Sequence, residues 1–561
     1  MPLHSATWVL GISASHNGAV CLLKDDEIVV AVQEERLSRF KRHRINGAEP
    51  SRALDYCLDY AGITPDDLSL AVVCLQGRAS DARHAVESNP ALRRTRGTLP
   101  VLRIPHHLGH AVSAFATSGF EDAAVLVVDG AGSPFEDLSG EERAAVRSPV
   151  EDGWETVSLY NASGTSVAPL EKHLVERGGW FRPRGGGMPG FGSLGGMFSA
   201  VAAQIFGDPS EAGKVMGLAP YGAATTPARA FFGMEDGGFR FLDDVPATFT
   251  HAERWPARPE EYRNLSASVQ AALEVAILHL VGRLRELCPS RNLCYAGGVA
   301  LNSVANERVI RESGFRAVYI PPAAEDSGAA IGAAYYGLWH LTGRNSRRRL
   351  VHDACGRSYS RRVVSAAAEK FAPRVGELRP DDVIAEAIER LCAGQIIGWF
   401  DGGSELGPRA LGQRSIICDP RRADAKEILN LRVKRREPFR PFAPVVPLED
   451  AAEWFELDGA PPESPFMLRV CRFREGQAAR VPAVVHVDGT GRVQTVTREA
   501  NGRFYELVRK FGEATGVPIL LNTSFNVMGE PIVETPEDAL ACLLDSGLDC
   551  CVFEDRIVVK N

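Results

Sequence analysis

The sequence lacks the cysteine and glycine patterns that mark several common kinds of site. Its twelve cysteines are scattered without a C-x-x-C pair, and the only adjacent two are Cys550 and Cys551. This spacing excludes a zinc ribbon and a disulfide framework, so we expect reduced thiols. The G-x-x-x-x-G-K-[ST] loop is also missing, which argues against a P-loop nucleotide-binding enzyme.

A long hydrophobic run and an excess of positive charge are missing as well. The apolar start Trp8–Ile12 is too short for a signal peptide, and no run approaches the apolar length of a membrane span. With 63 Lys and Arg against 71 Asp and Glu, the net charge is −8. Such a chain has no long-range attraction to nucleic acid or to anionic membranes. We therefore expect a cytoplasmic protein that binds neither.

What is present is typical of a loop-rich globular enzyme. Of the 561 residues, 45% are hydrophobic and 24% charged, with 54 Gly and 35 Pro. A chain of this length exceeds one hydrophobic core. The polar, basic stretch Thr342–Arg349 follows the small-residue segment Gly328–Leu338 and is the best candidate boundary. We predict two domains, residues 1–348 and 349–561.

The hydrophobic pattern predicts the α/β class for both domains. Two similar apolar segments, Trp8–Ser13 and Ala124–Asp129, resemble buried strands that enter tight turns, which suggests two related halves. Ser266–Cys288 has the spacing of a long amphipathic helix. The second domain is expected to be a smaller mixed α/β unit with Arg-rich loops. Its apolar runs are Gln395–Trp399, Ser415–Cys418, Phe442–Val446 and Pro518–Leu521.

Two histidines and two aspartates form a candidate metal site. His106 and His110 are four residues apart, which on a helix places them on one face. Alone, the pair is better explained as two histidines on a partly exposed helix. However, Asp129 ends the second predicted strand and Asp326 precedes a small-residue helix, and strand ends are where sites gather in α/β folds. Without thiolates, this set suits iron or manganese better than structural zinc.

A second group of residues is a candidate nucleotide site. Gly297 and Gly298 follow an apolar strand and precede Asn302, so bare backbone and helix N–H groups can approach a ligand there. Upstream, Glu211 offers a carboxylate for ribose hydroxyls and Lys214 a charge for phosphate. A solvated surface charge is an equally good explanation of Lys214.

Cations gather in the loops of the second domain. The group includes Arg409, Arg414, Lys434, Arg436, Arg440 and Arg492. For Arg409, Arg414 and Arg440, which are flanked by apolar and turn residues, we favour anion binding over a solvated surface, because guanidinium groups bind phosphate bidentately. The segment Asn522–Asn526 follows an apolar strand and adds amide and hydroxyl groups.

Taken together, these segments closely resemble the O-carbamoyltransferase family of antibiotic and nodulation-factor biosynthesis. The resemblance implies an actin-like ATPase fold for the N-terminal domain, similar to the TsaD family of tRNA threonylcarbamoylation, and a YrdC-like α/β C-terminal domain. The matching motifs, in the order of the family, are SHNGAV with EERLSRFKR, HHLGHAVSAF, VVDGAG, EAGKVMGLAPYG, CYAGGVALN, EDSGAAIGAA, ELGPRALGQRSI, VKRREPFRPFAP, HVDGTGRVQTV and LLNTSFN.

The resemblance implies that the C-terminal domain makes carbamoyl adenylate and pyrophosphate from carbamoyl phosphate and ATP with Mg²⁺. Lys434 and Arg440 would be the catalytic residues there. The implied substrate-binding residues are Arg409, Arg414, Arg436, Arg492, Asn522, Ser524 and Asn526.

For the N-terminal domain, the resemblance implies transfer of the carbamoyl group to a hydroxyl of a small natural product. The implied metal, iron or else manganese, would be held by His106, His110, Asp129 and Asp326, and the adenosine by Gly297, Gly298, Asn302, Glu211 and Lys214. His16 is the candidate to accept the hydroxyl proton. The next two residues, Asn17 and Gly18, differ from the Asp and Ala usual in the family. A homodimer is compatible with the resemblance.

Two other functions share parts of this pattern. A tRNA-modifying enzyme would share the fold and the metal, but it should present a continuous basic face, and the charge balance here is acidic. An actin-like nucleotide-binding regulator would leave the arginine loops of the second domain without a role. The sequence does not identify the acceptor.

Overall fold

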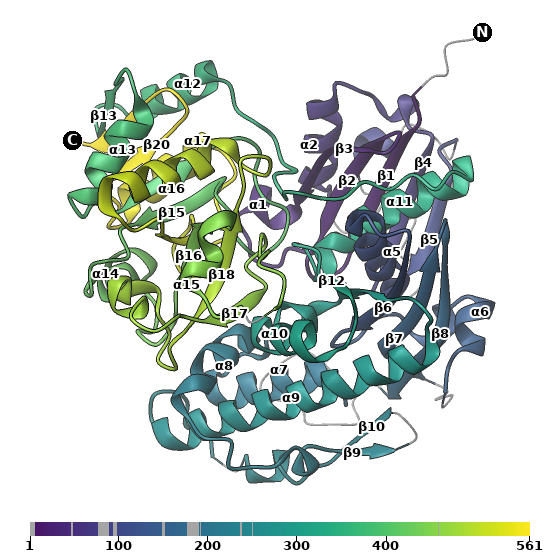
Figure 1. The fold of residues 1–561 in the computed structure, drawn as a ribbon. Coiled ribbons are helices and arrows are strands. Elements are labelled where there is room, and N and C mark those ends of the chain that lie inside the picture. Colours follow the sequence, from purple (N-terminus) through teal and green to yellow (C-terminus); the bar gives the residue numbers. More distant parts are fainter. Residues whose placement is uncertain are drawn as a thin grey trace. The chain divides into compact units, whose positions relative to one another are not determined.

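The chain forms two compact units. The computed structural model describes residues 6–46, 49–76, 89–93, 98–147, 152–176, 190, 192–235, 238–249, 251–457 and 459–561. The first unit comprises residues 1–34 and 44–350, and the second comprises residues 35–43 and 351–561 (Figure 1). The division after Leu350 lies close to the boundary predicted at 348/349. The sequence did not predict that residues 35–43 belong to the second unit.

Two five-stranded sheets with the same topology build the first unit. One has the order β3-β2-β1-β4-β5 and the other the order β12-β11-β6-β7-β8. In each, the central strand pairs antiparallel with the next strand along the chain and parallel with the strand on its other side. This duplication confirms the two related halves and the actin-like ATPase class. The strands are β1 (Trp8–Ala14), β2 (Ala19–Lys24), β3 (Glu27–Gln33), β4 (Leu70–Leu75), β5 (Val101–Pro105), β6 (Asp122–Val128), β7 (Gly153–Ser163), β8 (Ser166–Glu176), β11 (Asn292–Ala296) and β12 (Ala317–Tyr319).

The helices of the first unit include the two that frame the candidate metal site, α5 (His106–Ser118) and α11 (Ala329–Thr342). The others are α2 (Arg52–Ala61), α4 (Pro90–Arg93), α6 (Gly140–Ala144), α7 (Leu194–Phe206), α8 (Ala212–Leu218), α9 (Pro259–Leu287) and α10 (Ser303–Glu312), and β9 (Phe232–Glu235) pairs antiparallel with β10 (Gly238–Phe241). Helix α1 (Glu34–Ser38) begins at the last residue before the chain enters the second unit, and its other residues belong to that unit.

Small residues let α5, α11 and β1 approach backbone to backbone. A Cβ placed on Gly332 would lie 1.9 Å from the carbonyl oxygen of Gly109, and one on Gly11 would lie 2.1 Å from that of Ala330. No side chain fits at such distances. The glycine and alanine content of the EDSGAAIGAA segment therefore reflects this close packing.

Helix α9 corrects the expectation that no segment approaches the apolar length of a membrane span. It contains a window long and apolar enough to cross a membrane, although its sequence has no uninterrupted apolar run of that length. However, 61% of that window is buried inside the protein, and α9 packs against α7, α8, α10 and β6. Its apolar residues thus serve the core of the first unit.

The second unit is built on a mixed nine-stranded sheet. Its order is β13-β21-β20-β14-β15-β19-β16-β18-β17. Strands cover all four predicted apolar runs at least in part, which confirms the mixed α/β class. The strands are β13 (Val375–Leu378), β14 (Ile397–Phe400), β15 (Arg414–Cys418), β16 (Ala443–Pro447), β17 (Arg469–Arg472), β18 (Thr490–Val496), β19 (Leu520–Ser524), β20 (Cys550–Val552) and β21 (Ile557–Lys560).

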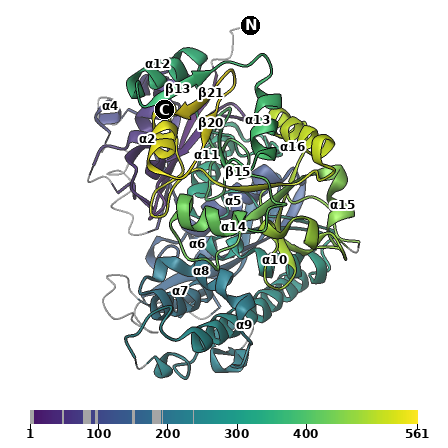
Figure 2. The same cartoon turned by 90° about the vertical axis from the view of Figure 1, so that its left-hand side faces the viewer.

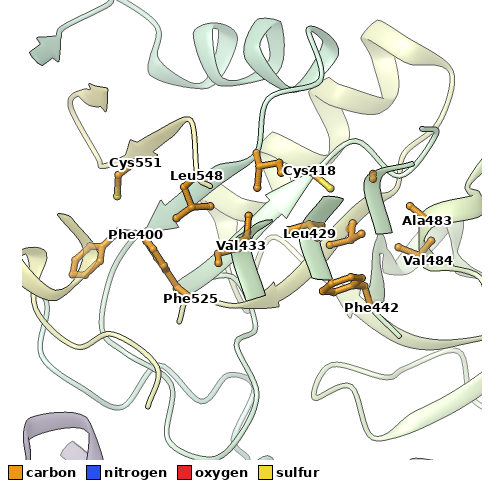
Figure 3. Close-up of a cluster of buried hydrophobic side chains, with 14 of the residues drawn as sticks. Phe400, Cys418, Leu429, Val433, Phe442, Ala483, Val484, Phe525, Leu548 and Cys551 are labelled. Atoms are coloured by element: carbon orange, nitrogen blue, oxygen red, sulfur yellow. The ribbon is translucent and has the colours of Figure 1, made fainter. Parts of the chain in front are cut away.

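Each face of this sheet has its own hydrophobic cluster, because alternate side chains of a strand point to opposite faces. On one face Ile397, Trp399 and Ile417 pack with helices α13 (Val383–Cys392) and α16 (Gly502–Thr515). These two helices lie next to each other (Figure 2). On the other face Phe400 and Cys418 pack with Leu429, Val433 and Phe525 (Figure 3). Helices α12 (Arg361–Phe371), α14 (Ala425–Ile428), α15 (Ala451–Trp454) and α17 (Pro536–Asp545) also contribute residues to this second cluster.

Candidate functional site

The four predicted metal ligands converge at the start of α5. One potential ligand atom from each of His106, His110, Asp129 and Asp326 lies within 4.8 Å of all the others. The two Nε2 atoms are 3.2 Å apart, and that of His106 lies 3.3 Å from a carboxylate oxygen of each aspartate. All four residues are buried, so neither histidine lies on a partly exposed face. Two imidazoles and two carboxylates facing one point fit a divalent first-row metal ion.

The electrostatics of this cluster support the same conclusion. Although burial opposes it, the carboxylate of Asp326 raises the pKa of His106 well above its usual value. The neighbouring histidines lower the pKa of Asp129, against the effects of burial and Asp326. Positive charge at the histidine nitrogens therefore stabilises the two buried carboxylates. A metal ion would supply that charge at the same place.

The first turn of α5 is held by residues that the sequence did not single out. Glu155 accepts hydrogen bonds from the backbone N–H groups of His107 and Ser133, at 2.9 and 3.0 Å. Ser133 in turn accepts one from the N–H of His106 at 2.9 Å. Lys172 balances the buried Glu155 carboxylate at 2.7 Å. These contacts fix the backbone that presents His106.

His16 lies beside the same cluster. Its Nδ1 is 3.0 Å from Asp326, and its side chain is 36% exposed. Burial opposes a charged imidazole, but Asp326 outweighs it and raises the pKa of His16 to about 9. In this arrangement His16 carries a proton. Its predicted role as a proton acceptor stays a prediction. The neighbouring Asn17 donates to Glu325 at 2.8 Å.

The predicted glycine pair lies next to the metal cluster. Gly297 has φ of +96°, and a Cβ there would lie 2.2 Å from the carbonyl oxygen of Val128. A Cβ on Gly298 would lie 3.0 Å from Asp129 Oδ1. Asn302 caps α10 by accepting from the N–H of Ala305. The loop that was predicted to hold a nucleotide thus adjoins a candidate metal ligand.

Glu211 and Lys214 pair with each other rather than standing apart. Their charged groups are 3.1 Å from one another, and the Lys214 side chain is 10% exposed. The ammonium group also lies 5.4 Å from the centre of the Phe206 ring. Lys214 is therefore not the solvated surface charge considered as the alternative. Binding of a nucleotide by these two residues remains a prediction.

In the second unit, four arginines form a cluster of like charges, which we call the arginine cluster: Arg409, Arg436, Arg440 and Arg492. Burial and the charge of Arg440 lower the pKa of Arg409 to about 10 and that of Arg436 to about 9. Burial and the other three arginines also lower the pKa of Arg492. These shifts indicate buried cations that need a counter-charge.

Carboxylates of the described residues supply little of that counter-charge. Arg440 lies 3.8 Å from Glu437. Within the described ranges, no ion pair joins Arg409, Arg436 or Arg492 to a carboxylate, and Nε of both Arg409 and Arg492 is buried without a hydrogen-bond partner. An anionic ligand such as a phosphate would compensate these charges.

Lys434 is bound within its own motif. Its Nζ donates to the backbone oxygen and to Oδ1 of Asn526, at 3.0 and 2.8 Å, and to the backbone oxygen of Ser524. Burial, reinforced by Arg436, lowers the pKa of Lys434 well below its usual value. Lys434 is thus brought together with Ser524 and Asn526, two of the residues expected to bind the substrate. In this structure Lys434 holds the 524–526 loop.

Two predicted ligands are engaged in scaffold contacts. Arg414 is fully buried, donates to the backbone oxygens of Asp401 and Glu534 at 2.6 and 3.3 Å, and stacks on Phe400 at 3.6 Å. Asn522 is also fully buried and donates to the backbone oxygen of Ala410 at 3.1 Å. Arg414 is the first residue of the buried strand β15. This position in an apolar run could have predicted a structural role for Arg414.

His486 and Lys426 are further members of this region that the sequence analysis missed. Burial, helped by the charges of Arg492 and Lys426 and opposed by Asp488, lowers the pKa of His486 to about 4. The Thr490 hydroxyl donates to Asp488 at 2.7 Å, so it accepts from Nδ1 of His486 at 3.0 Å. His486 is therefore neutral, with its proton on Nδ1. His486 could have been singled out from the sequence, because it is the first residue of the motif HVDGTGRVQTV, which also contains Arg492.

Comparison with known proteins agrees with these features. Residues 8–85 and 78–335 match the family model described as Carbamoyltransferase N-terminus, and residues 388–560 match Carbamoyltransferase C-terminus. Nodulation protein NolNO of Sinorhizobium fredii is 35% identical, over 100% of this chain and 81% of its own length. The uncharacterized protein sll1178 of Synechocystis is 34% identical, over 99% of this chain and 97% of its own length.

Among solved structures, the chain is distantly similar to HypF of T. kodakarensis. The TM-score is 0.41 with 14% identity, over 61% of this chain and 48% of that one. This likeness is too distant to support a functional argument. The matches along both units and the extent of the similarity to NolNO carry the assignment instead: the chain belongs to the carbamoyltransferase family and is a carbamoyl-transferring enzyme.

Proposed function

We propose that this protein is an ATP-dependent O-carbamoyltransferase with one half-reaction in each unit. The second unit would convert carbamoyl phosphate and ATP to carbamoyl adenylate. The first unit would transfer the carbamoyl group to a hydroxyl of a small natural product. The observation that carries the proposal is that an under-compensated arginine cluster lies in one unit and a convergent His and Asp cluster in the other.

For the first half-reaction, atom balance requires one water molecule. Hydrolysis of carbamoyl phosphate releases phosphate and leaves carbamate, whose oxygen attacks the α-phosphorus of ATP and expels pyrophosphate. Apart from water, all species in this reaction are anions, so the buried arginines would bind and orient them against their mutual repulsion. Arg440 is the best placed of the four, because its charge acts on the other three.

For the second half-reaction, the acceptor hydroxyl attacks the carbonyl carbon of carbamoyl adenylate, and AMP leaves. A metal ion bound by His106, His110, Asp129 and Asp326 would supply Lewis-acid stabilisation of the phosphate oxygens. The Gly297–Gly298 backbone, which adjoins Asp129, would hold the nucleotide. The acceptor proton goes to His16 once the charge of Asp326 no longer holds the imidazole protonated.

Adenylation has a physical purpose in this scheme. Carbamate is a poor electrophile, and adenylation attaches a good leaving group to it. The intermediate would be destroyed by water, so it has to be used in a site from which water is excluded. The burial of the His and Asp cluster is consistent with this requirement. Iron, with manganese as the alternative, is the metal that the ligand set favours.

The direct test is product formation. The enzyme, ATP with Mg²⁺, carbamoyl phosphate and a candidate alcohol are incubated together, and the products are analysed by mass spectrometry. We expect a mass increase of one carbamoyl group on the alcohol, together with AMP. Formation of the product without ATP, or binding of adenosine nucleotides without any turnover of carbamoyl phosphate, would contradict the proposal.

A further inference from the structure

The segment Glu35–His43 has a position that the proposed function does not explain. It comes from the EERLSRFKR motif near the start of the chain, yet its contacts place it in the second unit. The chain leaves the first unit after Glu34 and returns to it at Arg44. We call this segment the strap.

Two arginines attach the strap to the second unit at separate points. Arg39 donates to the backbone oxygens of Pro531 and Ile532, at 3.0 and 2.7 Å. Arg36 is 1% exposed, and its Nη2 donates to the backbone oxygen of Gly407 at 2.6 Å. A charged hydrogen bond from a buried guanidinium to a carbonyl is a strong contact. Arg36 therefore fixes the peptide that precedes Pro408.

Gly407 belongs to the loop that presents Arg409 to the arginine cluster. Beyond Arg409, the loop is fixed again, because Ala410 accepts from Asn522 at 3.1 Å. Further along, Oε1 of Glu405 accepts from the N–H groups of Leu411, Gln413 and Arg414, at 2.8, 2.8 and 3.2 Å. Arg409 thus stands between two anchored peptides, of which the first depends on the strap.

The strap also supplies charge to the base of this loop. Burial and the neighbouring Glu405 raise the pKa of Asp353 well above its usual range, while the charge of Arg36 opposes this rise. Asp353 accepts from the N–H of Leu406 through its backbone oxygen at 2.9 Å. Arg36 is therefore a cation whose charge acts on the side chain of Asp353, the residue whose backbone oxygen holds Leu406.

We infer that Arg36 is a positioning residue for the first half-reaction, acting through the carbonyl of Gly407 to place Arg409 against the anionic substrate. The inference rests on the proposed function of the second unit. The N-terminal EERLSRFKR motif then belongs functionally to the C-terminal anion site. A protein cut at the boundary near residue 350 would lack part of that site.

The test compares two arginines of the strap in the full-length enzyme. Arg36→Met keeps most of the side-chain volume and removes the donor and the charge. We expect the KM for carbamoyl phosphate, measured by pyrophosphate exchange into ATP, to rise about tenfold or more, because a misplaced contact weakens binding of the anion. Arg36→Lys should recover part of the loss. The matched control Arg39→Met, which removes contacts to other carbonyls, should leave this KM unchanged.

A second readout is independent of turnover. Titration calorimetry with pyrophosphate alone should give weaker binding for Arg36→Met than for the parent and for Arg39→Met. If Arg36→Met does not fold, Arg36→Gln, which loses the charge and whose N–H donor ends two bonds short of the guanidinium nitrogen, must still show the raised KM. Parental KM and pyrophosphate affinity in a folded Arg36 variant would overturn the inference. Absence of carbamoyl phosphate-dependent exchange in the parent would instead contradict the proposed function.

Discussion

The carboxylate of Glu155 and the ammonium group of Lys172 lie 2.7 Å apart, and both side chains are fully buried. The other oxygen of this carboxylate accepts from the backbone N–H of His107. Lys172 also donates to Ser158 and Tyr160 at 3.0 and 2.8 Å. The pair thus connects the hairpin β7–β8 to the first turn of α5, next to the candidate metal ligands.

The first prediction concerns this pair. Lys172→Met leaves the Glu155 carboxylate buried without its cation, and breaking such a pair typically costs about 3–5 kcal/mol. We expect a lower melting temperature and weaker metal binding. The exposed pair of Arg308 and Glu312 is the control, since Arg308→Met should cost about 0.5 kcal/mol or less. Thermal unfolding and metal titration measure both effects; equal, small effects of the two substitutions would contradict this role.

The second prediction concerns the metal. The purified parent protein should contain about one iron or manganese ion per chain, because two imidazoles and two carboxylates form one site. His110→Ala removes one ligand and should lower the content to near zero, and chelation should abolish transfer. His251→Ala, which changes a histidine bound to Glu261, should keep the metal. Elemental analysis of the purified proteins measures the metal content. Full carbamoyl transfer by a metal-free protein would refute the predicted role of the metal.

The third prediction concerns the order of the chemistry. Exchange of labelled pyrophosphate into ATP should depend on carbamoyl phosphate and should not need the acceptor alcohol, because adenylation precedes transfer in the proposed scheme. The measurement is the rate of label incorporation with each substrate omitted in turn. Exchange supported by bicarbonate alone, or absent under all conditions, would exclude the adenylate route.

The fourth prediction concerns the pH dependence of stability. His486 has a folded-state pKa of about 4, below its ordinary value near 6.5. Between these values the unfolded chain binds a proton that the folded chain does not, so stability falls as the pH falls from about 6.5 to about 4. The loss should be on the order of 2 kcal/mol at about pH 5. His486→Gln should reduce it, as seen from melting temperatures at about pH 7 and about pH 5. An unchanged pH dependence would contradict a buried neutral His486.

The candidate metal site could be predicted because its signals are local. The spacing of His106 and His110 gives one helix face, and Asp129 ends an apolar strand. Glu155 and Lys172 could not be found in this way. They lie on two strands whose register, with Leu159 opposite Glu171, is a property of the folded hairpin.

The second unit shows the same limit. The sequence identified the cations of its loops, but not which of them would meet carbonyls and which would meet one another. Arg414 donates hydrogen bonds to backbone oxygens, whereas the buried Nε of Arg409 has no hydrogen-bond partner. Arg36 is positioned by its hydrogen bond to Gly407, which lies 371 residues further along the chain. No local sequence pattern specifies a contact over that separation.

The central claim, that the two half-reactions belong to different units, is tested most directly by supplying carbamoyl adenylate to site variants. Arg440→Ala removes a phosphate-binding charge and should slow adenylation about a hundredfold or more. Its transfer site is intact, so added carbamoyl adenylate should restore product. His16→Ala and His106→Ala should still form the adenylate and fail to pass it on. If added adenylate rescues the histidine variants and not Arg440→Ala, the two units have the opposite roles and the account is wrong.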